Sequence, residues 1–177
     1  MIPEPSRDSL VRAAAGDAEA FGEIVGILMR YTYNLAARMC GDRVEAEDLA
    51  QDVLVRLHGQ LDRYDLGRPF GPWFRTLAVR TILNALRKNV PFPSDLHEDA
   101  VTTDFAAPRE PSERLRAALN LLPEEYRAVV TMRYMEELPL SQIGETLGVP
   151  EGTVKTWLFR AREMIRATLE PHLEELP

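Results

Sequence analysis

Apolar side chains recur at steps of three and four residues in three stretches of the N-terminal half. The first stretch covers residues 17–41, where Asp17 can cap the start of a helix and Gly41 can end it. The second covers residues 42–61 and the third covers residues 73–88, with the turn-forming sequence YDLGRPFGP between them. Each stretch carries one apolar face, so the pattern predicts three amphipathic helices.

The helical periodicity stops at residue 89 and returns after residue 110. Segment 89–110 contains several prolines and a surplus of acidic residues, so we expect a linker that does not pack on its own. After it, PSERLRAALNLL and PEEYRAVVTMRYMEE each open with a proline in the first turn of a predicted helix. No stretch alternates convincingly as a strand would. The predicted fold class is therefore all-α, with two small helical domains over residues 1–88 and 111–177.

Residues 138–162, LPLSQIGETLGVPEGTVKTWLFRAR, contain two short helical patterns separated by Gly-Val-Pro. Gly148 permits the positive φ of a tight helix end, and Pro150 can stop one helix while the next begins. This spacing indicates a helix-turn-helix. Its second helix would turn these side chains outward, toward bases and phosphates: Glu151, Thr153, Lys155, Thr156, Phe159 and Arg160. The alternative is a structural αα-hairpin whose polar face is only solvated.

Charge and composition exclude several classes of function. The 177 residues have a formal net charge of −7, which opposes DNA binding by the free chain and disfavours an autonomous helix-turn-helix regulator. No nucleophile–base pair, metal-ligand spacing or glycine-rich phosphate loop is visible, so we expect no enzyme, metal or cofactor. The start MIPEPSRDSL lacks the parts of a secretory signal, and no apolar run is long enough for a membrane span. We therefore expect a cytoplasmic protein.

The two halves together resemble the extracytoplasmic-function (ECF, group 4) sigma factors of bacterial RNA polymerase. The stretch LPEEYRAVVTMRYMEELPLSQIGETLGVPEGTVKTWLFRAR is similar to region 4 of that family. FGEIVGILMRYTYNLAARMCGDRVEAEDLAQDVLVRL, followed by GRPFGPWFRTLAVRTILNALRK, is similar to region 2. The resemblance implies a factor that binds core RNA polymerase and promoter DNA and directs initiation at −35 and −10 elements. It also implies regulation by an anti-sigma factor, with no small-molecule substrate and no insertion into a membrane.

The resemblance further implies a role for each segment. Residues 1–88 would bind polymerase and open the −10 element, residues 89–110 would link the domains, and residues 111–177 would read the −35 element. The residues implied for polymerase binding are Asp48, Gln51 and Asp52. Those implied for −10 recognition and melting are Phe70, Trp73, Arg80, Asn84, Arg87 and Lys88. For Trp73, capture of an unstacked base and burial in the core both stay open, whereas burial is favoured for Phe74.

The chain also departs from the family pattern. Arg80 stands where relatives commonly carry asparagine, and Trp157 and Phe159 replace arginine and histidine in the motif GTVKSRLHRAR. The promoter sequence therefore cannot be copied from a relative. The negative charge fits the resemblance, because the polymerase can supply non-specific affinity for DNA while two linked reading domains act together. The alternative is a sigma-like module that sequesters a regulator without reading DNA. The cationic residues expected to read DNA, such as Lys155 and Arg160, are intact, and this argues against it.

Overall fold

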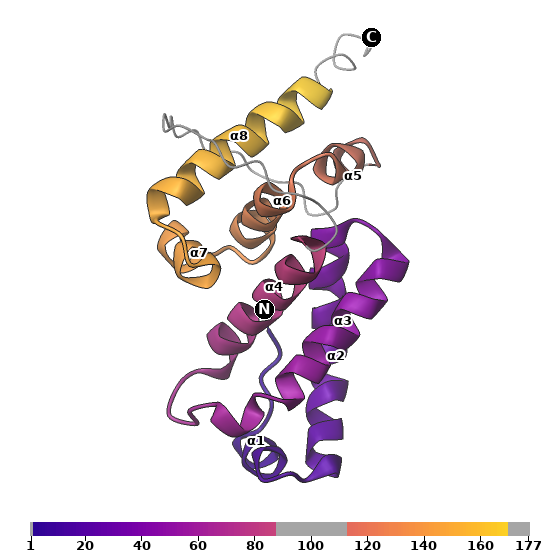
Figure 1. Ribbon diagram of the computed structural model, residues 1–177, viewed down its shortest axis with the longest axis vertical. Coiled ribbons are helices and arrows are strands. Elements are labelled where there is room, and N and C mark those ends of the chain that lie inside the picture. The colour runs from indigo at the N-terminus through magenta and orange to yellow at the C-terminus, as the bar shows by residue number, and fades with distance from the viewer. Residues whose placement is uncertain (1, 88–112, 170–177) are drawn as a thin grey trace. The chain divides into compact units, whose positions relative to one another are not determined.

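The computed structural model describes residues 2–87 and 113–169, which fall into two compact units. Of the described residues, one unit comprises residues 2–37 and 42–85, and the other comprises residues 38–41, 86–87 and 113–169. Every regular element of the described residues is a helix, which confirms the all-α prediction (Figure 1). None of these helices is both long and apolar enough to cross a membrane. The domain boundaries stay a prediction, because they fall among residues 88–112, outside the described ranges.

The first unit contains the three predicted amphipathic helices and two short elements that the periodicity did not predict. The bounds are α1 Arg7–Ala14, α2 Ala18–Cys40, α3 Arg43–His58, the 3₁₀ turn η1 Leu61–Arg63 and α4 Phe70–Arg87. Ser6 caps α1, because its hydroxyl accepts a hydrogen bond from the Ser9 N–H at 3.0 Å. Helix α4 begins at Phe70, three residues before the predicted start, because Pro72 is compatible with a first helical turn.

Carboxylates at two turns fix where the long helices begin. Asp17 accepts hydrogen bonds from the Glu19 and Ala20 N–H groups at 3.0 and 3.1 Å, which confirms the predicted cap of α2. Arg12 also pairs with Asp17, at 2.7 Å from Nη2 to Oδ2. The Ala20 N–H and then Arg12 hold the pKa of Asp17 below its usual value. Asp42 caps α3 in the same way, through the N–H groups of residues 44 and 45.

The core of the first unit lies between α2, α3 and α4. Phe21 of α2 meets His58 of α3 edge to face at 4.7 Å, and Tyr31 of α2 lies 6.2 Å from Phe74 of α4. These ring contacts agree with the arrangement of the three helices in Figure 1. The largest fully buried side chains of this unit are Phe70, Phe74, Ile24, Leu28, Leu35, Leu57, Leu61, Ile82 and Val53. Apolar burial on this scale stabilises the unit and leaves the outer faces of α3 and α4 for contacts with other molecules.

The second unit is built around its last helix. The bounds are α5 Glu113–Asn120, α6 Glu124–Val130, the π-helical turn η2 Thr131–Met135, α7 Leu140–Leu147 and α8 Glu151–Leu169. Helices α5, α6 and α7 all pack against α8. The helix predicted over PEEYRAVVTMRYMEE forms as α6, but the chain changes to a π-helical turn after Val130. Glu137, with φ of 55°, then redirects the chain toward α7.

Candidate functional site

Helices α7 and α8 form the predicted helix-turn-helix. Gly148 has φ of 75°, and its N–H donates to the carbonyl of Gly144 at 2.8 Å, as a left-handed helix cap requires. The Val149 N–H donates to the same carbonyl at 3.0 Å. Gly144 is buried under this turn, and a Cβ placed on it would lie 2.7 Å from the carbonyl oxygen of Val149. The close approach of turn and helix depends on a residue without a side chain.

The outward face of α8 is narrower than the sequence predicts. Glu151 and Arg160 are exposed, and the other predicted outward residues except Thr156 are half-buried: Thr153, Lys155 and Phe159. Lys155 Nζ lies 2.9 Å from Glu151 Oε1, so the cation and the acid form a surface pair. The expectation for Thr156 is wrong. It is only 6% exposed, and its hydroxyl donates to the Gly152 carbonyl at 3.1 Å, because a helix packed by three others has more than one covered stripe.

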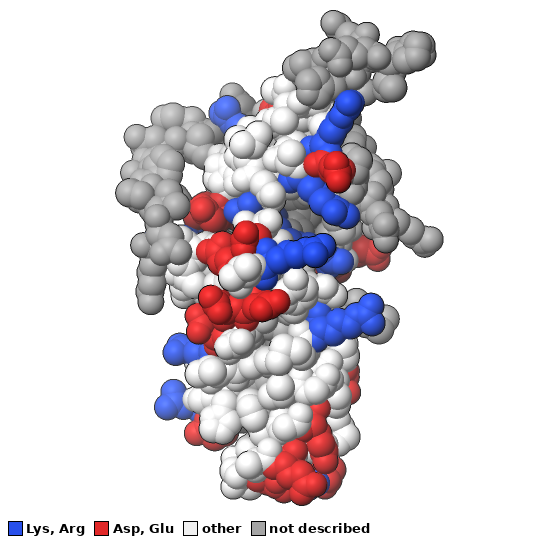
Figure 2. Space-filling view, turned by 90° about the vertical axis from the view of Figure 1, so that its right-hand side faces the viewer, with Lys and Arg blue, Asp and Glu red and all other residues white. Residues whose placement is uncertain are grey.

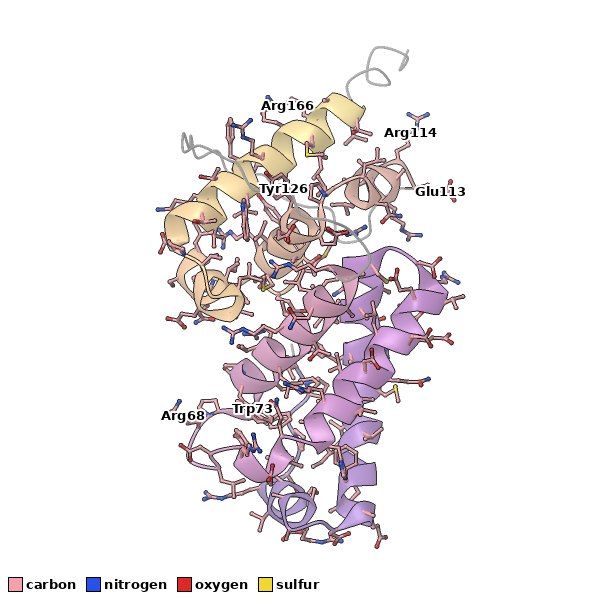
Figure 3. The ribbon with its side chains drawn as sticks, in the orientation of Figure 1. Arg68, Trp73, Glu113, Arg114, Tyr126 and Arg166 are labelled. Carbon is pink, nitrogen blue, oxygen red and sulfur yellow. The ribbon has the colours of Figure 1, made fainter. Side chains whose placement is uncertain are left out.

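Helix α6 packs against α8 through an aromatic contact. The ring of Tyr126 on α6, labelled in Figure 3, lies near α8, where the centroid of the Trp157 ring is 6.5 Å from its own. Burial raises the pKa of Tyr126, and the charge of Arg160 opposes this shift only in part. One turn further on, Arg162 donates from Nε and Nη2 to the Tyr134 hydroxyl at 2.9 and 2.7 Å. These contacts fix the rotation of α8 and thus which side chains face outward.

Helix α4 carries the predicted polar stripe of the first unit. Arg80, Asn84 and Arg87 are all exposed, and their spacing of four and three residues sets them on one face. Thr76, one turn earlier, donates its hydroxyl to the carbonyl of Pro72 at 3.0 Å. Arg80 and Asn84 therefore present one guanidinium group and one amide of the first unit, which suits a phosphate contact and one position of base readout. Arg87 falls in the other unit, and its Nε donates to Glu125 Oε1 at 2.9 Å. Lys88 lies outside the described residues.

An aromatic cluster lies at the start of α4. Trp73 is half-buried, with its ring 4.7 Å from Tyr64 and 5.8 Å from Phe70. Phe70 is 1% exposed and stacks on Phe74 at 5.5 Å, so both phenylalanines belong to the core, and Phe70 leaves no surface in the free chain for the DNA contact expected of it. Phe70 is the first residue of α4, and its side chain is buried in the core. Tyr64 also belongs to this cluster, and it is the first residue of the turn-forming sequence YDLGRPFGP, although the helical pattern gives no signal for it.

The loop between Tyr64 and Phe70 is held by local bonds. The Asp65 carboxylate accepts from the Gly67 N–H at 2.9 Å, and the Arg68 N–H donates to the Asp65 carbonyl at 3.0 Å. The Tyr64 hydroxyl donates to the carbonyl of Arg68, which draws the loop toward the aromatic cluster. Figure 3 labels Arg68 on this loop and Trp73 near the start of α4. Burial, followed by the charges of Glu4 and Asp65, raises the pKa of Tyr64.

Helix α3 exposes the residues predicted to bind the polymerase. Asp48, Gln51 and Asp52 are all exposed, on the side opposite the buried Leu49, Val53 and Leu57. Two valines on the same helix, Val44 and Val55, are also exposed, and the sequence analysis did not single them out. Acidic and basic side chains are interleaved on the face in Figure 2, and the described residues drawn there form no continuous basic surface. This mixed charge agrees with the net charge of −7.

Two sequence families match the chain in the predicted order. Sigma-70 region 2 matches residues 24–91, and Sigma-70, region 4, matches residues 112–165. Among individual relatives, the ECF RNA polymerase sigma factor SigW of Bacillus subtilis (strain 168) is 32% identical over 170 residues, which cover 87% of this chain and 91% of SigW. The ECF RNA polymerase sigma factor SigE of Mycolicibacterium smegmatis is 31% identical and covers 97% of this chain and 72% of SigE.

Two solved structures share the fold at low sequence identity. CnrH, in complex with the cytosolic domain of CnrY, has a TM-score of 0.62 at 22% identity and covers 96% of this chain and 99% of that chain. The sigma factor RpoE, in complex with the anti-sigma factor NepR from Bartonella quintana, has a TM-score of 0.63 at 18% identity and covers 86% and 98%. Given both sigma-70 regions and a relative matched at 32% identity over nearly its whole length, the chain belongs to the ECF sigma factors of RNA polymerase.

Proposed function

We propose that this sigma factor divides promoter recognition between its two ends. Residues 1–88 bind core polymerase and open the −10 element, residues 111–177 read the −35 element, and residues 89–110 link the two. The observation that carries the proposal is the helix-turn-helix of α7 and α8, with an exposed Arg160 and a half-exposed Lys155 on the second helix. A helix presented in this way fits the major groove, where its first turns reach base edges and phosphates.

In the −35 element, the proposed contact residues lie on the outward face of α8: Glu151, Thr153, Lys155, Phe159 and Arg160. The Lys155–Glu151 pair can exchange its partner for a phosphate at little cost, because a solvent-exposed ion pair contributes only about 0–1 kcal/mol. The ring of Phe159 offers an apolar contact for a thymine methyl group. Arg160 is the residue from which we expect the largest single contribution, since its guanidinium group is exposed.

In the −10 element, α4 supplies both anchoring and melting. The exposed Arg80, Asn84 and Arg87 contact phosphates and one base, while Trp73 receives a base that has left the stack. The Tyr64 ring lies 4.7 Å from the Trp73 ring and restricts its motion. Trp73 therefore loses less conformational entropy when a base stacks on it. Stacking of one base on an aromatic side chain is worth about 1–3 kcal/mol, which is enough to shift an opening equilibrium.

Core polymerase binds the outer face of α3 through Asp48, Gln51 and Asp52. The two carboxylates and the amide are solvated in the free protein, so they can form charge-assisted hydrogen bonds with cationic groups of a partner. The polymerase then supplies the non-specific affinity for DNA that a chain of net charge −7 lacks. This function needs no catalytic group, cofactor or small-molecule substrate of the chain's own, and its place is the cytoplasm.

An anti-sigma factor regulates the protein in this proposal. The support is indirect: the fold is shared with a sigma factor that was solved together with an anti-sigma factor. A protein that covers the outer face of α3 would block polymerase binding without unfolding either unit. Such an inhibitor would compete directly with core polymerase for the free sigma factor.

Reconstitution with core polymerase and a library of promoter sequences tests the proposed function. We expect transcripts only from promoters that share a −35 and a −10 element, and we expect the two elements to be separated by a fixed spacing. The competing function, a module that sequesters a regulator without reading DNA, predicts tight polymerase binding but no transcript from any promoter. That outcome would contradict the proposal.

A further inference from the structure

Residues 2–6 have the sequence IPEPS and form the indigo stretch that precedes α1 in Figure 1. Each proline fixes its own φ and pushes the residue before it, Ile2 or Glu4, toward an extended conformation. Ser6 is extended as well, with ψ of 150°, and it caps α1. The backbone of this stretch is therefore restrained to an extended form that spans about 12 Å. We call residues 2–6 the IPEPS arm.

One end of the arm is held by α1. Pro5 is buried, and the hydroxyl of Ser9, which is 6% exposed, donates to Glu23 Oε2 on α2 at 2.8 Å. Helix α1 also packs against η1, whose last residue directly precedes Tyr64. The arm therefore begins from a base that is attached to two other elements of the first unit.

The other end of the arm meets the first turn of α4. A Cβ added to Gly71 would lie 3.8 Å from both Cβ and Cδ1 of Ile2, so the Ile2 side chain lies where a side chain of residue 71 would project. Glycine loses more conformational freedom on folding than any other residue, and the first N–H groups of a helix have no partner inside it. The contact with Ile2 therefore stabilises the turn of α4 that is least able to hold its own conformation.

We propose that Ile2 is a positioning residue for the capture of an unstacked base by Trp73. Trp73 lies two residues after Gly71, within the first four residues of α4, so the direction of its ring depends on how this turn is held. The Ile2 contact keeps the Trp73 ring beside the Tyr64 ring, 4.7 Å away. A ring that is already fixed loses less entropy when a base stacks on it. The inference rests on the proposed role of Trp73 in the −10 element.

The contact of the arm with α4 lies outside the core of the unit. Ile2 and Gly71 are both half-buried, whereas the neighbouring Phe70 and Phe74 are at most 1% exposed. Removal of the Ile2 side chain should therefore leave the unit folded while it loosens the first turn of α4. Opening of the promoter can then be measured separately from stability.

The first test measures opening by the full-length protein in the holoenzyme. Ile2→Ser should lower the fraction of open complexes about 2- to 10-fold, the effect of releasing one side chain from a fixed conformation. Permanganate reactivity per bound complex reports this fraction, and a template that is already melted should restore it. Val11→Ser is the matched control, because Val11 is an apolar residue of α1 that is 45% exposed. It should change opening by less than about twofold.

Stiffening the same turn by another route should replace the arm. Alanine at residue 71 favours the helix, and its Cβ fits at 3.8 Å from Ile2, so Gly71→Ala should recover part of the opening that Ile2→Ser loses. Gly22→Ala is the control, because it stiffens α2 instead and no atom lies within 4 Å of the added Cβ. Equal recovery by both alanine variants would mean that general stability explains the effect, and it would overturn the inference.

A spectroscopic test reports on the ring without polymerase. The chain has two tryptophans, so Trp157→Phe leaves Trp73 as the single one. In this background, Ile2→Ser should increase the fast motion of Trp73 in time-resolved fluorescence anisotropy of the free protein, and Val11→Ser should not. Unchanged motion of Trp73 in the Ile2→Ser protein would refute the positioning role.

Combination with Trp73→Ala separates failure of the inference from failure of the proposed function. If Ile2 acts through Trp73, Ile2→Ser should add no further loss of opening to Trp73→Ala, whereas independent effects would multiply and refute the inference. If Trp73→Ala lowers opening and Ile2→Ser alone does not, the role of the arm is refuted and base capture survives. Normal opening by Trp73→Ala would refute both. Increased opening by Ile2→Ser would make the arm a cover of the site rather than its support.

Discussion

Trp73 lies where its side chain can pack against other aromatic residues of the protein and can also stack on a base of the DNA. One side of its ring faces Tyr64 and Phe70, and the residue still keeps part of its surface exposed at the start of α4. If that surface receives an unstacked −10 base, Trp73→Ala should lower the fraction of open complexes about 5- to 150-fold, the equivalent of about 1–3 kcal/mol. Permanganate reactivity of promoter thymines, measured per bound complex, reports this fraction.

Two controls separate base capture from a loss of packing. Trp73→Phe keeps a ring and should retain most of the opening, and a template that is already melted should rescue Trp73→Ala. A purely structural Trp73 predicts a lower unfolding midpoint and weaker polymerase binding, with normal opening in each complex that still forms. That second pattern would remove Trp73 from the −10 site.

Arg160 supports a prediction about how the −35 element is read. Arg160→Ala should weaken promoter binding by the holoenzyme while leaving polymerase binding nearly unchanged. A lost phosphate contact lowers the slope of log affinity against log salt by about one, whereas a lost base contact costs about 1–3 kcal/mol and relaxes one promoter position. Arg166→Ala is the control, because Arg166 is exposed near the other end of the same helix. Equal losses in polymerase binding and promoter binding would contradict the assignment.

At the level of single residues, the sequence predicts exposed positions well, but it fails at buried residues that lie outside the main apolar face. Asp48, Gln51, Asp52, Arg80 and Asn84 were expected on outer faces and are exposed. Thr156 and Phe70 were expected to reach DNA and are buried. One period of apolar residues gives one buried face, but it cannot tell that a helix is packed by three neighbours, as α8 is.

The turn between α7 and α8 gives a prediction at the level of elements. A Cβ on Gly144 would meet the Val149 carbonyl oxygen at 2.7 Å, so Gly144→Ala must push the turn away from α7. Such overpacking costs about 1–3 kcal/mol of unfolding free energy, and displacement of α8 should also weaken −35 binding. Gly152→Ala is the control, because no atom lies within 4 Å of the added Cβ. It should be neutral or stabilise the protein by up to about 1 kcal/mol in urea unfolding.

The elements that the sequence misses share a physical cause. Helix α1 covers only residues 7–14, too few turns for an apolar period, and the Ser6 cap was its one local signal. The π turn η2 follows an unbroken helical pattern, so neither its wider turn nor the left-handed Glu137 is visible in the sequence. Helix α2 was predicted because the Asp17 cap and the apolar periodicity agree, and α3 was predicted from its periodicity alone.

For the whole molecule, charge determines which assembly binds DNA. A net charge of −7 repels phosphates, so the free chain gains little from counterion release. Its reading helices are two weak sites on one chain, and they become strong only when polymerase holds both near the promoter. The same charge keeps the free factor away from the large excess of non-specific DNA.

The negative charge of the chain leads to a last prediction, which concerns DNA binding by the free protein. By fluorescence anisotropy at physiological salt, the free chain should bind promoter duplex no more tightly than about 10⁻⁴ to 10⁻⁶ M, the usual range of non-specific binding. Addition of core polymerase should make the binding tight and dependent on both promoter elements, because the two reading sites then act at a high effective concentration. Replacing either element should cost the holoenzyme much of its affinity and leave the free chain unaffected. Tight, sequence-dependent binding by the free chain would instead make it an autonomous DNA-binding regulator, whose negative charge would then need a different explanation.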